Sequence, residues 1–267
     1  METAQEEDML NQLQWTPELV GKFWDAFSQS PLANLSFSRM NGASLLEVVA
    51  PYVEPENRYL DFGAGDGDLI RLLIERDCCV AGYEPSAERR NKLSSQDFVK
   101  HANFLGIVGT DAEEVYDVVI AADVIEHVLD ADMDAVTKRM RKFLRPGGII
   151  IVSTPNNEDL DANSVYCPVS NLWFHRWQHV RSFTAESLND LFSRLGFQRL
   201  HDHHVDFSSS ANMIERLRKL KRKNRLRQHY DRLYSLLAKK KGKKKRGNQN
   251  NLRIGNESHL IYIGRLG

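Results

Sequence analysis

Apolar residues in the first two thirds of the chain fall into short runs that alternate with amphipathic stretches. The runs predict strands at 59–62, 79–84, 104–108, 117–122 and 148–154, and the stretches between them predict helices at 67–76, 86–94 and 131–142. Strands that alternate with helices over short connections are typical of a parallel sheet covered on both faces. The pattern therefore predicts an α/β fold with a doubly wound, mostly parallel sheet.

The segment before the first strand predicts two helices. Thr16 and Pro17 suit the N-cap and the first turn of a helix, and aromatic residues such as Trp24 recur after them at helical spacing. A second helix is predicted at about 40–49. Aromatic residues at this spacing most often pack against a core, so we expect residues 1–50 to form a helical cap beside the sheet.

Residues 156–183 follow the predicted sheet without a regular period. They hold many aromatic and histidine side chains: Tyr166, Trp173, Phe174, His175, Trp177 and His179. So many aromatic residues in a connecting segment indicate the wall of a pocket rather than an exposed turn. Beyond this segment, Thr184 predicts the start of a helix that ends before Gly196.

The strand expected after Gly196 carries a histidine cluster. Its members are His201, His203 and His204. Neighbouring residues of a strand face opposite sides of the sheet, and no cysteine or acid stands at ligand spacing beside the three histidines. We therefore expect surface or strand-end histidines here rather than a metal site.

Composition narrows the setting in which the protein works. Of 267 residues only three are cysteines, two of them the adjacent Cys78 and Cys79, which are too few for a disulfide framework and are expected to be buried thiols. The first residues are acidic and polar, unlike a secretory leader, and no apolar run approaches the length of a membrane span. These features predict a cytoplasmic protein.

The formal net charge is zero, but the charges are unevenly distributed. Residues 212–250 hold 16 Lys or Arg against two acids, a net charge of +14, so the rest of the chain carries −14. Apolar residues at helical spacing predict a basic helix at 212–238, within an insertion at 208–251 that precedes a last strand. The charge of this insertion is therefore the best guide to its partners.

A strongly basic amphipathic segment suits a small set of partners. Residues 212–246 would bind an anionic membrane surface or an anionic glycan or lipid-linked substrate, or they would grip nucleic acid through its phosphates. The lysine tract has no interleaved aromatic residues for base stacking, which favours the first two partners over nucleic acid. Pairing with the acidic remainder of the protein is the third alternative.

Three glycines follow the first predicted strand at every second position, Gly63, Gly65 and Gly67. Glycines between a strand and a helix form a tight turn that presents backbone N–H groups to a ligand. The spacing departs from the dinucleotide pattern G-x-G-x-x-G, and Asp66 and Asp68 would repel a pyrophosphate. The turn therefore predicts a ligand that is neutral or cationic at this end.

Acidic residues stand at the ends of several predicted strands. They are Asp61, Glu84, Asp111 and Asp123. Parallel strands of an open sheet end at one edge, so these side chains are expected to converge on one crevice. Glu84 lies 21 residues after Gly63, about the distance at which a neighbouring strand delivers a carboxylate to ribose hydroxyls.

Five segments in a fixed order carry a resemblance to a known family. They read D-F-G-A-G-D-G-D-L, C-V-A-G-Y-E-P-S, G-I-V-G-T-D-A, Y-D-V-V-I-A-A-D-V-I-E-H-V and L-R-P-G-G-I-I-I-V-S-T-P-N. In this order they resemble the class I S-adenosylmethionine-dependent methyltransferases over about residues 40–200 and the last strand. The I-E-H-V and S-T-P-N stretches are most similar to the branch that includes the ubiquinone-biosynthesis O-methyltransferases.

The resemblance implies a Rossmann-like methyltransferase fold with a seven-stranded sheet. It implies a core at 51–207 and 252–267, with the helical segment before it acting as a lid in which Trp15, Trp24 and Phe27 are the candidates. It also implies S-adenosyl-L-methionine as the cofactor. Its sulfonium cation would suit the acids of the glycine turn at 63–68, which is called the glycine cradle below.

The same resemblance assigns the cofactor contacts residue by residue. The residues that would hold the cofactor are Asp61, Gly63, Ala64, Gly65, Glu84, Pro85, Asp111, Ala112, Ala122 and Asp123. In this assignment Glu84 would accept the ribose hydroxyls, and Asp111 with the Ala112 amide would read the adenine edge. The segment that ends at Asp123 would pass under the reacting methyl group.

Three histidines are candidates for the base that takes a proton from the acceptor, because histidine titrates near neutral pH. They are His127, His175 and His179. An alternative follows from D-V-I-E-H, since Asp123, Glu126, His127 and His179 resemble the metal set of small-RNA 2′-O-methyltransferases, although that family has Glu where this chain has Asp123. We expect no metal, because similar E-H-V stretches occur in metal-independent relatives.

The expected activity is methyl transfer to a hydroxyl of a small polar, sugar-like or lipid-linked acceptor by in-line displacement. Three alternatives stay open: RNA ribose 2′-O-methylation with a divalent metal, N-methylation of a small molecule, and a non-catalytic binding module that keeps the fold. A protein that also uses its basic segment would be peripheral at the membrane.

Overall fold

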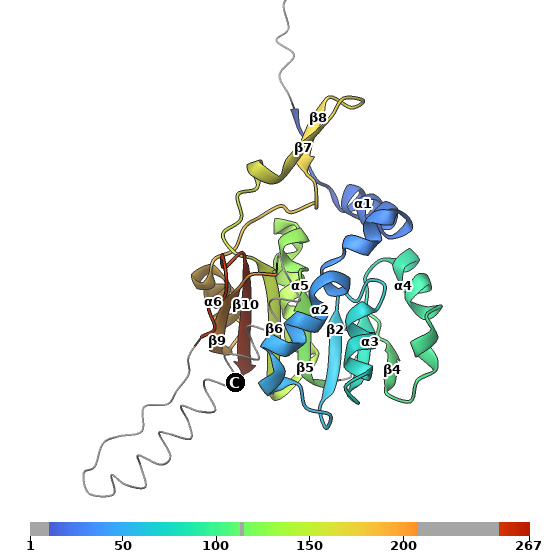
Figure 1. Ribbon diagram of the computed structural model, residues 1–267, viewed down its shortest axis with the longest axis vertical. Helices are drawn as coiled ribbons and strands as arrows, with labels where there is room; N and C mark the ends of the chain where they lie inside the picture. The colour runs from blue at the N-terminus through green and yellow to red at the C-terminus, as the bar shows by residue number, and fades with distance from the viewer. Residues whose placement is uncertain (1–10, 113–114, 208–250) are drawn as a thin grey trace, which may run out of the picture.

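The computed structural model describes residues 11–112, 115–207 and 251–267, and within them seven strands form one sheet (Figure 1). In sheet order the strands are β4 (Phe104–Ile107), β3 (Cys79–Tyr83), β2 (Arg58–Phe62), β5 (Tyr116–Ala122), β6 (Leu144–Pro155), β10 (His259–Leu266) and β9 (Phe197–Val205). The first five are parallel, and β10 is antiparallel to both of its neighbours. The predicted mostly parallel, doubly wound sheet is confirmed.

Helices cover both faces of this sheet. The helices are α2 (Phe37–Val48), α3 (Asp68–Ile74), α4 (Ala87–Ser94), α5 (Asp130–Lys142) and α6 (Ala185–Ser193). On one face Leu45 of α2 and Leu69 of α3 belong to the same buried cluster as Ile120 of the sheet. On the other face Met140 of α5 and Phe192 of α6 are buried in a second cluster. Burial on both faces explains why the strands read as continuous apolar runs.

The N-terminal segment divides between the cap and the core. The side-chain oxygen of Thr16 caps α1 (Pro17–Gln29) by accepting the Leu19 N–H at 3.3 Å, as the sequence predicted. A short 3-10 turn, η1 (Pro31–Leu35), then leads to α2, in which Leu45 and Leu46 are completely buried. The helix predicted at 40–49 is therefore part of the core layer, and α1 with η1 remains as the cap.

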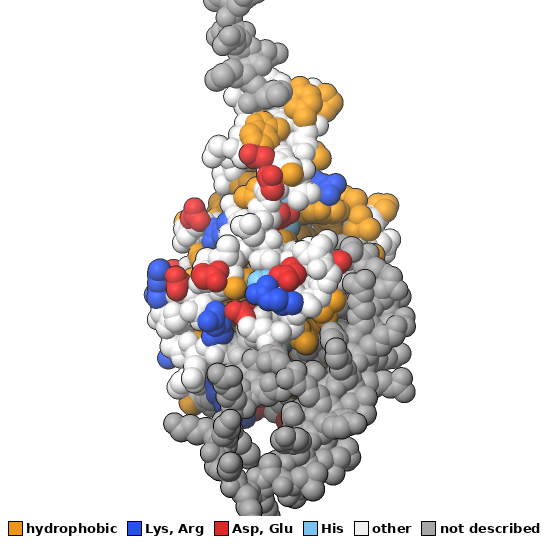
Figure 2. All heavy atoms as spheres, turned by 60° about the vertical axis from the view of Figure 1, so that its left-hand side comes forward, with side chains coloured by type: hydrophobic (Ala, Val, Ile, Leu, Met, Phe, Trp, Pro, Cys, Tyr) orange, Lys and Arg blue, Asp and Glu red, His pale blue; other side chains and the backbone are white. Residues whose placement is uncertain are grey.

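The segment after the sheet is more regular than its sequence suggested. Within residues 156–183 a hairpin of β7 (Ser164–Cys167) and β8 (Leu172–His175) pairs through β8 with β1 (Asn11–Gln12). This second sheet stands above the main sheet next to α1 (Figure 1). Its end carries exposed apolar side chains, among them Val169 at 95% exposure. Hydrophobic side chains gather near the top of Figure 2. Neighbouring residues of β7, such as Val165 and Tyr166, are both exposed, so its sequence does not alternate between apolar and polar residues as that of a half-buried strand does.

The remaining short elements connect these layers. They are η2 (Ala50–Tyr52), η3 (Asp97–Lys100), η4 (Ile125–His127) and η5 (Asp161–Asn163). The most constrained connection joins β2 to α3 through Gly67, which has φ +83° and whose added Cβ would lie 2.4 Å from a ring carbon of Phe98. A side chain at this position would be strained by both effects. The glycine turn is therefore required for the strand to pass directly into the helix.

Some expectations concern residues away from the cavity. His203 and His204 are buried near the end of β9, so they are strand-end rather than surface histidines. Neither belongs to the groups of three or more potential metal ligands found among the described residues. Cys78 is buried and Cys79 partly so, and both are free thiols. The predicted basic helix at 212–238 and most of the insertion lie outside the described residues. Within the described part of the chain, none of the helices combines the length and the apolar character that a membrane span needs.

Candidate active site

A cavity of about 1130 Å³ opens where the parallel strands end. The strands contribute residues at or near their carboxyl ends: Phe62 from β2, Tyr83 from β3, Ala122 from β5 and Pro155 from β6. Trp24 and Phe27 of α1 line the opposite side. Trp15 is not part of the lining, because its ring packs edge-on against Phe174 of β8. The cavity thus lies between the main sheet and the cap.

The glycine turn and Glu84 form one hydrogen-bonded unit. One carboxylate oxygen of Glu84 accepts the Gly65 N–H at 2.9 Å, and the other accepts the Ser86 N–H at 3.0 Å. The guanidinium of Arg89 lies 3.4 Å from Glu84, and it would be 2.5 Å from a Cβ added at Gly65. Glu84 is therefore fixed at the edge of the glycine cradle. Position 65 must be glycine, because a side chain there would collide with the Arg89 guanidinium.

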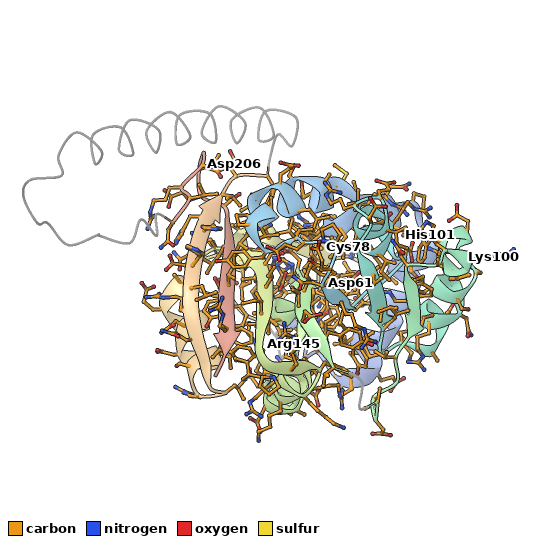
Figure 3. All side chains as sticks on the ribbon, turned by 90° about the horizontal axis from the view of Figure 1, so that it is seen from below. Asp61, Cys78, Lys100, His101, Arg145 and Asp206 are labelled. Atoms are coloured by element: carbon orange, nitrogen blue, oxygen red, sulfur yellow. The ribbon has the colours of Figure 1, made fainter. Side chains whose placement is uncertain are left out.

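Asp61 lies behind this cradle, near the middle of the sheet (Figure 3). Its side chain is buried, and its Oδ2 atom has no hydrogen-bond partner among the described residues. Burial, followed by the charges of Glu84 and Asp68, raises the pKa of Asp61 to about 8. A buried acid without a partner favours a cationic ligand, because opposite charge and a hydrogen bond would offset its desolvation.

Changing Asp61 to asparagine should make the stability of the ligand-free protein less sensitive to pH. The raised pKa means that folding is opposed by this group above about pH 4, increasingly so up to about pH 8. We expect the free energy of unfolding of Asp61→Asn, relative to the original chain, to rise by at least about 1 kcal/mol between pH 5 and pH 8. Urea titrations at the two pH values measure this difference, and a constant or falling difference would contradict the assignment.

The other predicted cofactor residues divide into two groups. Gly63, Ala64, Pro85 and Ala122 line the cavity together with Gly65 and Glu84. Asp111 and Ala112 do not, since Asp111 is exposed in the turn after β4. The Ala112 N–H already donates to the Gly109 carbonyl at 3.3 Å. Reading an adenine edge with this amide would require that turn hydrogen bond to open.

Asp123 has partners that its position in the sequence did not indicate. It follows β5 with φ +51°, and its Oδ1 accepts the Ser153 hydroxyl at 2.6 Å. Its Oδ2 lies 3.4 Å from Nε2 of His259, at the start of β10, and both side chains line the cavity. Asp123 is thus directed toward β6 and β10, and it is not part of the group formed by the residues after it.

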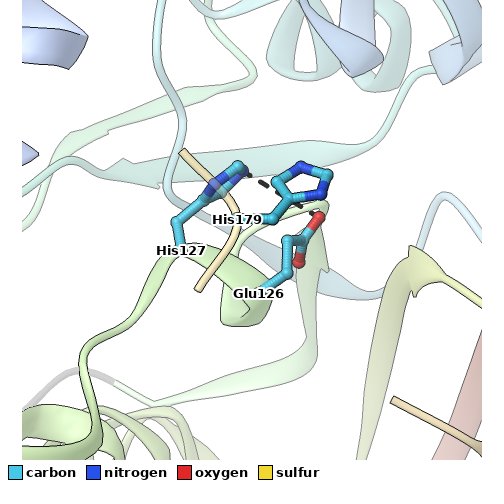
Figure 4. A group of neighbouring side chains, drawn as sticks. All are labelled: Glu126, His127 and His179. Carbon is cyan, nitrogen blue, oxygen red and sulfur yellow. Dashed lines mark ion pairs between the residues drawn. The ribbon is translucent and has the colours of Figure 1, made fainter. Parts of the chain in front are cut away.

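Glu126, His127 and His179 do come together, although His179 is distant in sequence (Figure 4). One potential ligand atom of each lies within 4.8 Å of the others, and Nε2 of His127 is 3.9 Å from Glu126. Both carboxylate oxygens of Glu126 and the Nδ1 of His127 are buried without a hydrogen-bond partner in the described structure. Burial, then the charge of Asp123, raises the pKa of Glu126 well above its usual value.

The environment of His127 keeps its ring neutral at physiological pH. Burial, followed by the nearby His179, lowers its pKa well below the usual value of histidine. The ring contacts Trp24 of α1 edge-on, with 4.6 Å between centroids. Trp24 in turn donates its indole N–H to the buried Gln178 at 2.8 Å, and Gln178 donates to the His127 carbonyl at 3.2 Å. Gln178, which directly precedes His179 in the chain, therefore links Trp24 of α1 to His127.

His179 and His175 share an acid that the sequence analysis did not single out. Nδ1 of His179 is 2.5 Å from Glu158, and Nε2 of His175 is 3.2 Å from the other oxygen of the same carboxylate. Burial would raise the pKa of Glu158, but the hydrogen bonds with His175 and His179 outweigh it and lower the pKa to about 2. Glu158 and His179 line the cavity, whereas His175 does not.

Sequence reasoning therefore missed Glu158, Gln178 and His259 as members of the site. A partial signal existed for Glu158, because it follows the end of a predicted strand by four residues, on the edge where the other acids lie. Gln178 stands between two candidate histidine positions but has no distinctive residue type. His259 belongs to the last strand, and only the pairing of β10 with β6 brings it to Asp123.

The charges of the lining are mostly acidic. Besides Glu84, Asp123 and Glu158, the acidic lining residues are Asp66, Asp68, Asp132 and Asp159. Among the described residues of the lining, the Lys or Arg side chains are Arg89 and Arg139. Arg89 is paired with Glu84, and Arg139 donates to the Tyr83 hydroxyl at 2.9 Å. A polyhydroxyl or cationic ligand suits this surface better than a polyanion.

Comparisons with known proteins agree on one family. A family model described as a methyltransferase domain matches residues 38–202. An uncharacterised methyltransferase of Geobacillus kaustophilus is 32% identical over 107 residues, which are 39% of this chain and 49% of that protein. The ubiquinone biosynthesis O-methyltransferase of Rhizobium leguminosarum bv. trifolii is 30% identical over 134 residues, 46% of this chain and 50% of that protein. The matches thus span about half the length of these curated relatives.

Solved structures resemble the fold at low sequence identity. The 1,6-didemethyltoxoflavin N1-methyltransferase of Burkholderia thailandensis, solved with bound 1,6-didemethyltoxoflavin and S-adenosylhomocysteine, has a TM-score of 0.58 at 14% identity. The resemblance covers 96% of this chain and 92% of that one. A possible histamine N-methyltransferase from Thermotoga maritima has a TM-score of 0.54 at 17% identity and covers 92% and 99% of the two chains. At these identities the likeness establishes the fold.

Proposed function

The chain belongs to the methyltransferase domain family, and from this premise we propose that it is an S-adenosylmethionine-dependent methyltransferase. The acceptor is a hydroxyl of a small polar, sugar-like or lipid-linked molecule. The observation that carries this proposal is the position of His179. This residue lines the cavity, and its Nδ1 is hydrogen-bonded to the Glu158 carboxylate. This leaves its other ring nitrogen to receive a proton.

The cradle fits the cofactor in the properties of its acids. The buried, unpartnered oxygen of Asp61 would receive a hydrogen bond and a positive charge from the α-ammonium group. Glu84, held at the edge of the glycine cradle by backbone N–H groups, would accept the ribose hydroxyls. Gly63, Ala64 and Gly65 would contact the methionine part. Asp111 with Ala112 stays a predicted adenine contact, subject to the rearrangement of its turn.

The chemistry asks little of the protein beyond alignment and proton removal. When bound, S-adenosylmethionine would supply an electrophilic methyl group, which passes in line to a lone pair of the acceptor while the thioether S-adenosylhomocysteine leaves. His179 takes the hydroxyl proton at Nε2, and the neutral His127 lies beside it as a second acceptor of hydrogen bonds. Trp24 and Phe27 of the cap exclude water from the reacting end.

A base distinguishes the hydroxyl from an amine acceptor. A neutral amine already offers a lone pair, whereas a hydroxyl becomes a good nucleophile only as its proton leaves. Imidazoles in the cavity are therefore best explained by O-methylation. N-methylation remains the alternative, since the acidic lining also suits a cationic molecule.

Two measurements test the proposed function. Calorimetric titration with S-adenosylhomocysteine should give saturable binding at one site, and its absence would reject the assignment. Transfer of tritium from labelled S-adenosylmethionine should then be measured with a panel of probes: methyl glycosides, a catechol, histamine and a short single-stranded RNA. Binding without transfer to any probe would favour the non-catalytic module.

RNA ribose methylation with a divalent metal is the second candidate function. It is favoured by the buried Glu126 carboxylate, which has no hydrogen-bond partner and lies near two imidazoles. Two observations weigh against it. Asp123 is engaged by Ser153 and His259, so the resembled four-residue set lacks its first member, and the acidic lining opposes a phosphate chain. The raised pKa of Glu126 allows a neutral acid here without a metal.

Metal removal separates the two candidates. We expect methyl transfer to the best hydroxyl probe to persist within about twofold after dialysis against EDTA, because His179 rather than a metal ion would activate the hydroxyl. A fall in the rate that Mg²⁺ or Mn²⁺ restores would reject this prediction and support the metal-dependent reaction. Cofactor binding measured in the same samples serves as the control for intact protein.

The partner of the basic segment 212–246 is a separate proposal, because the segment lies outside the described residues. We propose that it binds an anionic membrane surface, from its net charge and apolar spacing. Sedimentation with phosphatidylserine vesicles, compared with phosphatidylcholine vesicles, tests this. Equal sedimentation with both would reject it.

A further inference from the structure

Glu158 contacts both histidines of the segment that follows β6, and its two oxygens have different partners. Oε1 lies 3.2 Å from Nε2 of His175 and accepts a side-chain N–H of Asn163 at 3.0 Å. Oε2 lies 2.5 Å from Nδ1 of His179. Glu158 therefore stands between a histidine that lines the cavity and one that does not.

The protonation of His175 follows from its other contacts. Its Nδ1 faces two backbone N–H groups, those of Trp177 at 3.3 Å and of His179 at 3.1 Å. A nitrogen that accepts hydrogen bonds from N–H groups carries no hydrogen itself. The proton of neutral His175 is therefore on Nε2, and it is donated to Oε1 of Glu158.

Oε1 of Glu158 accepts from Asn163 and His175, and a carboxyl group is ordinarily ionised at physiological pH, so Glu158 accepts at both oxygens. The short contact at Oε2 is then a hydrogen bond donated by Nδ1 of His179. Neutral imidazole carries one N–H, so Nε2 of His179 must hold a lone pair. No described residue donates a hydrogen bond to that atom.

From this geometry we propose that Glu158 is a positioning residue that fixes His179 in the Nδ1–H tautomer and so presents the Nε2 lone pair to the acceptor hydroxyl. The inference rests on the proposed function for its catalytic part. His175 has a supporting role, because it fixes which oxygen of Glu158 remains for His179. A carboxylate that orients an imidazole in this way raises its efficiency as a base without touching the substrate.

The substitution Glu158→Gln tests the proposal, because an amide has one oxygen and one NH₂ group. The oxygen must face His175 and Asn163, which both donate, so the NH₂ group is left facing Nδ1 of His179. That nitrogen would then have to accept, which moves the proton of His179 to Nε2. The variant has nearly the same shape as the original residue, but it reverses the tautomer.

Nuclear magnetic resonance of protein labelled with ¹⁵N-histidine reads the tautomer directly and needs no cofactor. We expect the His179 signals, assigned with His179→Asn, to report Nδ1–H in the original chain and in Glu158→Asp, and Nε2–H in Glu158→Gln. Glu257→Gln is the matched control, because Glu257 also lies beside a histidine, His204, at 3.5 Å, but does not line the cavity. It should leave the His179 signals unchanged.

Turnover of the best hydroxyl probe of the panel supplies the catalytic readout. In Glu158→Gln we expect kcat to fall at least tenfold, while the affinity for S-adenosylhomocysteine and the KM of the probe change less than about twofold. Glu158→Asp should recover part of kcat, since it keeps two acceptor oxygens. An unchanged tautomer in Glu158→Gln, or an unchanged kcat despite a changed tautomer, would overturn the proposal. If the original chain did not bind S-adenosylhomocysteine, the proposed function itself would be rejected.

Discussion

Replacement of His179 by alanine is expected to lower kcat for methyl transfer to a hydroxyl probe by about 10²- to 10⁴-fold, the usual contribution of a positioned base. His179 lines the cavity, and its bond to Glu158 leaves one ring nitrogen for the substrate proton. The affinity for S-adenosylhomocysteine should change less than about twofold, because this residue is not part of the glycine cradle. Initial rates and calorimetry on the same preparation measure both quantities.

Two further alanine variants test the assignment of the base to His179. His127→Ala should cost less than His179→Ala, since His127 has no carboxylate hydrogen-bonded to its ring. His101→Ala is the matched control: His101 is exposed and lies at the periphery of the molecule in Figure 3. If His127→Ala abolished transfer while His179→Ala retained it, the role of base would belong to His127.

Replacement of Glu84 by alanine is expected to weaken binding of S-adenosylhomocysteine by about 1–3 kcal/mol, or roughly 5- to 150-fold. The carboxylate is only 1% exposed and is held by the N–H groups of Gly65 and Ser86, so it reaches the ribose position without further ordering. Charge-assisted hydrogen bonds to both ribose hydroxyls would be lost together. Calorimetric titration measures the change in affinity.

Glu84→Ala also removes the partner of Arg89, so a control for folding is needed. Glu84→Gln keeps the size of the side chain and should show a smaller part of the same loss. Glu88→Ala, in the first turn of α4 and outside the cavity lining, should bind the cofactor product as the original chain does. Unchanged affinity in a folded Glu84→Ala protein would remove Glu84 from the cofactor site.

The order of elements was predictable because it depends on local features. Apolar runs, the cap at Thr16 and the glycine at position 67 act within a few residues, so strands and helices of the core appear close to their predicted bounds. The strand-end acids were predictable for a related reason. Parallel strands must end at one edge, and Glu84 and Asp123 line the cavity there, whereas Asp61 is buried behind the lining and Asp111 is exposed outside it.

The second sheet and the division of the cap were not predictable in this way. The hairpin of β7 and β8 is paired with β1, which lies some 160 residues earlier in the chain, and its half-exposed side chains show no alternation. Likewise, only packing shows that α2 belongs to the core layer and, with α1, borders the cavity. Long-range pairing decided both features.

The sequence by itself determined the fold class, the cradle and the residue types from which a methyl-transfer site can be built. The tertiary structure decided which partners those residues have. It directed Asp123 to Ser153 and His259, moved His175 out of the cavity lining, and placed Glu158 where it sets the proton of His179. The reason is physical: a tautomer and a pKa depend on burial and on neighbours within a few ångströms, and those neighbours come from distant parts of the chain.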